Sequence, residues 1–316
     1  MEEVTGKLSR RVIIYSSAKG GVGKTTLSCI TADKLADNGY RTLLVDTDAQ
    51  GNATDLAGMT PYLGNDGPEE GHYKEALHDV ILAQVQKIFG QTSSINTRQA
   101  IYKARNFDVL PCDHRSERLK YWPQDNAHKF GTGIELYKLW KEKFPILLNS
   151  ALKEVQDDYD FIIIDTPPEL GWATESALKI SLAGYRETNV IIPIELGGFE
   201  IMGLDQVYNF INQCRKENRK LSLLGIVISR FGPRTANIDR DLEEEIRNDP
   251  LWGEFIFDTI VTRNLMIREA TLSKESIFRY KRRNLKKTLL INPNQFADEL
   301  LMWLRRRDND GGAAEV

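Results

Sequence analysis

A glycine-rich stretch near the start of the chain constrains its fold more than any other feature. Residues 17–26, SAKGGVGKTT, directly follow the apolar run Val12–Tyr15 and open a helical pattern over Thr25–Asn38. Gly20, Gly21 and Gly23 can adopt positive φ without steric cost, so successive backbone N–H groups can turn toward one anion. The start of the following helix adds unpaired donors and a favourable dipole. This order of strand, loop and helix predicts a phosphate-binding loop.

The rest of the chain continues the same alternation of apolar runs and amphipathic stretches. Unbroken apolar runs suit strands that are buried on both faces, as in a parallel sheet. Strands that alternate with helices predict an α/β fold with a doubly wound, mostly parallel sheet and helical insertions. The further runs are Thr42–Val45, Phe107–Leu110, Phe161–Ile164, Val190–Ile194 and Leu223–Ile228, and the helical patterns are Leu147–Val155, Thr174–Leu182, Gly203–Asn218 and Ile238–Arg247.

The length and composition fit one large domain. For 316 residues we expect a single domain over 1–307, insertions at about 60–105 and 113–146 on the rim of the sheet, and a disordered tail at 308–316. No apolar run approaches the roughly 18 residues of a membrane span, and no apolar segment follows the first charges as in a secretory signal. Three scattered cysteines suit neither a disulfide framework nor a zinc site. The cytoplasm is the expected compartment.

Three aspartates follow two of the predicted strands. Asp46 and Asp48 come directly after Thr42–Val45, and Asp165 comes directly after Phe161–Ile164. Because strand ends in open parallel sheets face the ligand crevice, we expect these carboxylates near the phosphate loop. A role as a turn or cap residue suits Asp48 better than Asp46. In the loop itself, Lys24 would meet the β- and γ-phosphates and the Thr25 hydroxyl would ligate Mg²⁺.

Several motifs together resemble a known family. The form KGGVGKTT, with Ala18 in place of the usual glycine and with an additional Lys19, resembles the deviant P-loop of the ParA/MinD/nitrogenase-iron-protein family. Within it, DTDAQGNAT at 46–54, DTPPELGWATESAL at 165–178 and TRNLMIREATLSKESIFRY at 262–280 resemble ParA/Soj partition ATPases. The resemblance covers roughly residues 11–59, 107–112 and 155–304. Nitrogenase iron proteins need paired cysteines, which this chain does not offer.

The resemblance implies a slow ATPase that binds Mg²⁺ and ATP between two subunits. Lys19 would reach the partner subunit's nucleotide, as an arginine finger does. Asp46 would orient the attacking water and the Mg²⁺ shell, and Asp165 would hold Mg²⁺ through water. The expected ATP-binding residues are Lys19, Gly20, Gly21, Val22, Gly23, Lys24, Thr25, Thr26, Arg263 and Asn264; the catalytic ones are Lys19, Asp46 and Lys24; and the metal-binding ones are Thr25, Asp46 and Asp165.

Basic residues concentrate near the C-terminus. Residues 263–307 carry 12 Lys and Arg against 4 Asp and Glu, a local balance of +8, whereas the whole chain has a net charge of -3. Such a segment is either a solvated helical face or a docking site for a polyanion. The resemblance favours sequence-independent DNA binding by the ATP-bound homodimer on the nucleoid, reset by a centromere-binding adaptor of the ParB type. The DNA-binding candidates are Arg230, Arg234, Arg263, Arg268, Arg279, Arg282 and Arg283.

Two other functions remain open at this point. A MinD-like positioning ATPase would dock on a membrane or a protein cargo, and a metabolic ATPase would use the same loop for ligation chemistry. The amphipathic segment Phe296–Arg307 bears on the first, because it suits either core packing, which we expect, or membrane docking.

Thr262 and Leu196-Gly197-Gly198 depart from the family pattern, so details of the subunit interface stay open. About ten residues precede the first strand, so we expect neither a helix-turn-helix domain nor operator binding.

Overall fold

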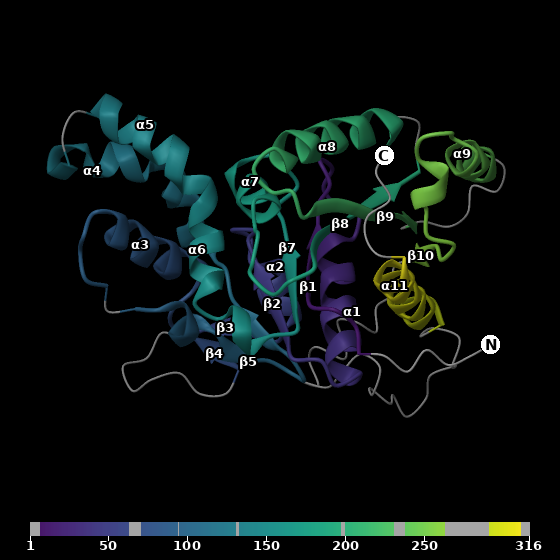
Figure 1. The fold of residues 1–316 in the computed structure, drawn as a ribbon, viewed down its shortest axis with the longest axis horizontal. Helices are drawn as coiled ribbons and strands as arrows, with labels where there is room; N and C mark the ends of the chain where they lie inside the picture. Colours follow the sequence, from purple (N-terminus) through teal and green to yellow (C-terminus); the bar gives the residue numbers. More distant parts are fainter. Residues whose placement is uncertain are drawn as a thin grey trace.

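The computed structural model describes residues 7–62, 71–93, 95–130, 133–196, 200–230, 238–262 and 291–310. Within these ranges an eight-stranded sheet runs through the molecule in the order β10-β9-β8-β1-β7-β2-β6-β5 (Figure 1). β5 pairs antiparallel with β6, and the other neighbours are parallel. The predicted doubly wound, mostly parallel sheet is therefore confirmed. The strands are β1 (Arg11–Tyr15), β2 (Thr42–Asp46), β5 (Tyr102–Lys103), β6 (Asp108–Leu110), β7 (Phe161–Asp165), β8 (Glu187–Glu195), β9 (Leu221–Arg230) and β10 (Val261–Thr262).

Helices cover both faces of this sheet. The core on one face includes side chains of α1 (Lys24–Asp37), α2 (Asn52–Leu56) and α11 (Ile291–Asn309). The core on the other face includes side chains of α3 (Leu77–Ile88), α6 (Leu147–Lys153), α7 (Trp172–Leu178), α8 (Glu200–Arg215) and α9 (Ile238–Arg247). Among the described residues, no helix combines the length and the apolar character that a membrane crossing requires.

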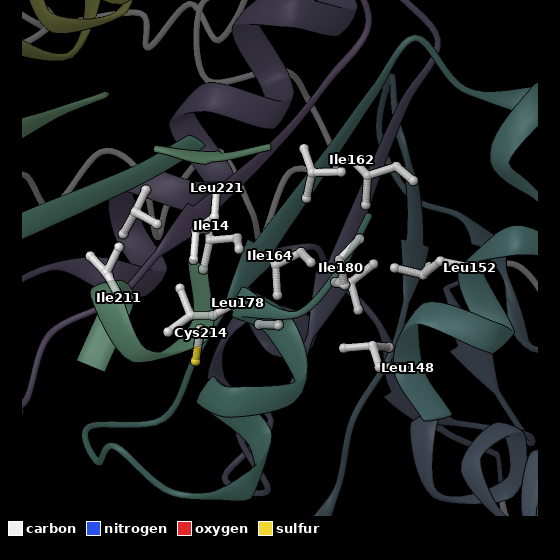
Figure 2. Close-up of a cluster of buried hydrophobic side chains, with 14 of the residues drawn as sticks. Ile14, Leu148, Leu152, Ile162, Ile164, Leu178, Ile180, Ile211, Cys214 and Leu221 are labelled. Atoms are coloured by element: carbon white, nitrogen blue, oxygen red, sulfur yellow. The ribbon is translucent and has the colours of Figure 1, made fainter. Parts of the chain in front are cut away.

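The central strands contribute to both cores in alternation. On β1, Val12 and Ile14 belong to one core and Ile13 and Tyr15 to the other, all of them fully buried. Figure 2 shows the first core, in which residues of β1 and β7 lie among side chains of α6, α7 and α8. Because successive strand residues point to opposite faces, a strand covered on both sides must be apolar throughout. This explains the unbroken apolar runs of the sequence.

The two predicted insertions lie at the β6–β5 edge of the sheet. The first holds a small parallel pair, β3 (Thr60–Pro61) and β4 (His72–Tyr73), with α3, the 3₁₀ helix η1 (Thr97–Ala100) and β5. The second holds η2 (His114–Tyr121), α4 (Trp122–Phe130), α5 (Gly133–Lys143) and η3 (Phe144–Ile146), and α4 and α5 project away from the sheet in Figure 1.

A stack of aromatic rings joins these insertions to the body of the domain. Phe89 stacks on Trp122 with 5.8 Å between ring centroids, Trp122 on Trp140 with 5.0 Å, and Trp140 on Phe144 with 4.1 Å. Phe144 in turn lies 4.6 Å from Trp172, the first residue of α7. Aromatic pairs at such distances add about 0.5–1.5 kcal/mol each beyond the area that they bury. The insertions are thus packed onto the helix that follows β7.

The C-terminal helix packs on the body, as predicted. Phe296, Leu300 and Leu304 of α11 are buried in the core on the α1 face. The predicted tail boundary, in contrast, is wrong at its first residues, because α11 continues to Asn309. The Asp308 carboxylate accepts hydrogen bonds from the Ser9 backbone N–H at 2.9 Å and from the buried Arg11 guanidinium at 2.6 Å. A buried guanidinium needs such a partner. Residues 311–316 lie outside the described part of the chain.

Candidate nucleotide-binding site

The predicted phosphate loop connects β1 to α1. α1 begins at Lys24, and Gly23 precedes it with φ 90°, while Gly21 has φ 79°. Both glycines therefore occupy the left-handed region that favours glycine. Gly20 differs from the prediction, since its φ is not positive, and a Cβ placed there would only touch the Pro168 ring at 3.6 Å. No side chain caps the start of α1. Its first N–H groups are thus available to an anion.

The Lys24 side chain turns back over this loop. It is buried, and its Nζ donates to the carbonyl oxygen of Lys19 at 2.9 Å and to that of Ser17 at 3.5 Å. Burial lowers the pKa of Lys24, while the nearby charges of Asp165 and Asp48 act in the opposite direction. The ammonium thus lies between the loop and the acidic strand ends, where a bound polyphosphate would gain most from it.

The carboxylates predicted at the strand ends lie level with one another. The strand register pairs Asp165 with Tyr15 on one side and with Asp46 on the other. The hydroxyls of Thr47 and Thr166 reinforce this alignment, because they donate to the carbonyl oxygens of Asp165 and Tyr15 at 2.7 and 2.8 Å. The register of three strands therefore brings residues from distant parts of the sequence to one edge.

Asp165 has the features of a metal-binding carboxylate. Both of its side-chain oxygens are buried and find no hydrogen-bond partner among the described residues. Burial raises its pKa, the charge of Asp46 raises it further, and the nearby Thr25 hydroxyl and Lys24 partly compensate. Unpaired buried polar atoms are rare and point to a missing ion or water. A carboxylate beside a threonine hydroxyl suits Mg²⁺, which is typically held by one or two carboxylates together with substrate phosphates.

Asp46 and Asp48 differ in how their oxygens are occupied. Asp46 is fully buried; one oxygen accepts the Asp48 N–H at 3.0 Å, and the other accepts the Thr54 N–H and hydroxyl, both at 2.8 Å. Burial raises the pKa of Asp46 to about 7, although these hydrogen bonds oppose the rise. Asp48 is partly exposed, and one of its oxygens accepts the Gln50 N–H at 2.9 Å. Asp48, which the sequence suggested as a turn residue, is therefore the more accessible carboxylate.

The loops around the site contact the second insertion and border a cavity beside β8. Gln50 donates to Glu117 of η2 at 3.4 Å. On the other side, a cavity of about 400 Å³ lies between the phosphate loop and the β8–α8 region and is lined partly by Ala18, Lys19 and Leu204. Lys19 itself is exposed.

The remaining predicted site residues fall largely outside the described chain. Arg230 is the last residue of β9, and its backbone aligns with Thr262 of β10. The other predicted contacts for adenine or DNA lie outside the described residues: Arg234, Arg263, Asn264, Arg268, Arg279, Arg282 and Arg283. Their roles stay predictions.

A glycine-lined loop between a central strand and a helix, with a buried lysine and an unpaired carboxylate on the neighbouring strand, defines a P-loop nucleotide-binding protein. A family model described as an AAA domain matches residues 10–223. Soj, the sporulation initiation inhibitor protein of Bacillus subtilis (strain 168), is 29% identical over 85% of this chain and 91% of its own length. The chromosome partitioning protein ParA of Myxococcus xanthus (strain DK1622) is 30% identical over 85% of this chain and 81% of its own length. The chain belongs to the ParA/Soj/MinD family of P-loop ATPases with a deviant Walker A loop.

A solved structure shows the same fold. Cobyrinic acid a,c-diamide synthase from Mycobacterium smegmatis, with bound ATP analogue and magnesium, aligns with a TM-score of 0.65 over 92% of this chain and 94% of that one, at 22% identity. At this identity the likeness concerns the fold alone. The sequence matches, by contrast, place the chain among partition-type ATPases.

Proposed function

We propose that the chain is a DNA-partition ATPase, in which Mg²⁺ and ATP drive a homodimer that binds DNA without sequence preference. The observation that carries the nucleotide part is the Asp165 carboxylate, buried and unpaired beside Lys24 and Thr25 at the phosphate loop. The likeness to Soj and ParA supports the partition role.

In this proposal each residue of the site has a defined task. The N–H groups of the loop and Lys24 bind the phosphates, with Thr26 donating to the α-phosphate. Thr25 and Asp165 hold Mg²⁺, whose charge offsets that of the phosphates, with the aspartate acting through water. Asp46 would contact Mg²⁺ through a water molecule, as predicted from the sequence. Asp46 would also orient the attacking water, and the hydrogen bonds from Thr54 and Asp48 hold its carboxylate in place.

The second subunit completes the site. We propose that Lys19 reaches the partner subunit's phosphates, where a positive charge would stabilise the transition state. Arg263 and Asn264 would lie near the adenine. A dimer closed in this way would bring basic residues of both subunits onto one surface, with Arg230 and the arginines at 234, 263, 268, 279, 282 and 283 as candidates. DNA binding would keep the ATP-bound form on the nucleoid of the cytoplasm.

Hydrolysis would end the DNA-bound state. Slow intrinsic turnover would give this state its lifetime, and an adaptor of the ParB type, bound to centromere-like DNA, would accelerate the reset. The main alternative is a MinD-like positioning role on a membrane or a protein cargo. Burial of Phe296, Leu300 and Leu304 in the core argues against membrane docking through α11, because the apolar face of the helix is already covered.

A DNA mobility shift with Mg²⁺ and ATP, repeated across a salt series, tests the proposal. We expect wild-type protein to shift unrelated DNA sequences equally and to lose affinity steeply as salt rises, because bound phosphates release counterions. Lys24→Ala is the control and should neither bind ATP in calorimetry nor shift DNA. Retention on anionic liposomes without any ATP-dependent DNA shift would favour the positioning role instead.

A further inference from the structure

Ser229 connects the phosphate loop to two strands that lie far away in the sequence. It belongs to β9, one residue before the end of the strand, and its side chain is buried. Its hydroxyl lies 2.7 Å from the carbonyl oxygen of Val22 in the phosphate loop and 2.9 Å from that of Ile194 in β8. A serine hydroxyl has one hydrogen, so it donates to one of these oxygens at a time or is shared between them.

The contact with Val22 fixes a donor of the phosphate loop. In a planar trans peptide the carbonyl group of one residue and the N–H of the next point in opposite directions. When Ser229 holds the Val22 carbonyl toward β9, the Gly23 N–H must point away from β9. Gly23 has positive φ and immediately precedes α1. The orientation of the Val22–Gly23 peptide therefore also affects the position of Lys24, the first residue of the helix.

We propose that Ser229 is a positioning residue for nucleotide binding, which holds the Val22–Gly23 peptide with its N–H toward the phosphates. Ser229 itself contacts no nucleotide in this arrangement. The inference rests on the binding of Mg-ATP by the phosphate loop, which is part of the proposed function. It adds a residue that lies 207 positions from Val22 and outside the phosphate loop.

A merely structural role makes a different prediction. If the hydroxyl served only to join β9 to β8 through Ile194, its loss would lower stability and leave the affinity for Mg-ATP unchanged. Ser222 provides a matched control, because it is also buried on β9 but lies near the other end of the strand. There its hydroxyl accepts hydrogen bonds from Asn189 and Arg307, at 2.9 and 3.0 Å.

The test measures the dissociation constant of Mg-ATP by calorimetry and the melting temperature without nucleotide. We expect Ser229→Ala to weaken Mg-ATP binding roughly tenfold, as the loss of one buried hydrogen bond would. Ser229→Thr keeps the hydroxyl and should restore binding to within about threefold of wild type. Ser222→Ala should bind Mg-ATP as wild type does, even if it melts at a lower temperature.

Three results would overturn the inference. They are a Ser229→Ala affinity within about twofold of wild type, an equal loss in Ser222→Ala, and a failure of Ser229→Thr to restore binding. Should Ser229→Ala not fold, Ser229→Cys takes its place, because a thiol is of similar size but donates weakly. Wild-type protein that binds no Mg-ATP would refute the proposed function as well, whereas normal binding by Ser229→Ala would refute this inference alone.

Discussion

At the scale of single residues, the site contains two buried carboxyl groups that lower the stability of the folded chain. Asp46 and Asp165 lie side by side on the neighbouring strands β2 and β7, and both are fully buried. Burial raises the pKa of each, and the charge of Asp46 contributes to the rise at Asp165. Such pairs favour a bound cation over the empty site.

We therefore expect Asp165→Asn to raise the stability of the protein while it weakens nucleotide binding. Without nucleotide at neutral pH, the free energy of unfolding should be about 1–3 kcal/mol higher for the variant than for wild type, because the amide removes the cost of burying an ionisable carboxyl. Its advantage should grow as pH rises above about 4, because the carboxyl then ionises in the unfolded chain while burial opposes its ionisation in the folded one. Mg²⁺-dependent ATP binding should fall at least tenfold. Urea denaturation and calorimetry measure the two effects, and a variant less stable than wild type at pH 7 would contradict the argument.

Local motifs predicted some residues of the site and missed others. Lys24, Asp46 and Asp165 could be placed from the sequence because glycines and strand ends determine their surroundings locally. Ser229 could not, since only the folded sheet brings it to Val22. The difference between Asp46 and Asp48 was also hidden, because the partner Thr54 decides which carboxylate is occupied.

At the scale of elements, one carboxylate fastens the first insertion to the body. Glu154, directly after α6, accepts hydrogen bonds from Gln84 and Lys87 of α3 and from the N–H and hydroxyl of Thr97 in η1. Burial alone would raise its pKa, but these donors bring the pKa down to about 2. The ionised form of Glu154 is therefore the one that stabilises this junction.

Glu154→Gln should weaken that junction in a pH-dependent way. We expect it to lower the free energy of unfolding by about 1–2 kcal/mol at pH 7, after allowance for screening by solvent. A carboxylate with a lowered pKa contributes above its unfolded pKa and loses the contribution as pH falls toward the folded value. The gap between wild type and variant should thus shrink as pH falls from about 4.5 toward 2. Urea unfolding at several pH values measures it. The exposed Glu142→Gln serves as the control, and a gap that widens in acid would refute the assignment.

The sequence located the central elements better than their ends or the insertions. The strands were predictable because burial on both faces leaves an unbroken apolar run. The helical pattern Thr174–Leu182, however, ends at Leu178 in the structure. There the side-chain amide of Asn218 donates to the carbonyl oxygens of Leu178 and Ile180, at 3.0 and 2.7 Å. The sequence gives no sign of that contact, nor of the stacking between Trp122 and Trp140 that orders the second insertion.

At the scale of the assembled molecule, the proposed dimer makes each nucleotide site from two chains. Lys24 is buried against its own loop, where it can serve only the nucleotide of the same chain. Lys19 of the same loop is exposed, as a group that acts on a facing subunit would have to be. If Lys24 serves its own chain and Lys19 the partner, the two lysines of one chain belong to different nucleotide sites. A chain that lacks one lysine can then form a complete site with a chain that lacks the other.

Mixing two inactive variants tests that division. Lys19→Ala chains would bind ATP but offer the partner no lysine, and Lys24→Ala chains would offer Lys19 but bind no ATP. Each variant alone should hydrolyse almost no ATP. In a mixed dimer, the loop of the Lys19→Ala chain would meet an intact Lys19 from its partner, which makes one complete site. Only one chain of the mixed dimer binds ATP; if such dimers form as often as random pairing allows, an equal mixture would restore about a quarter of the wild-type rate. A mixture that forms mixed dimers, as sedimentation would show, but is no more active than its separate components would mean that Lys19 serves its own nucleotide, and the shared site would have to be abandoned.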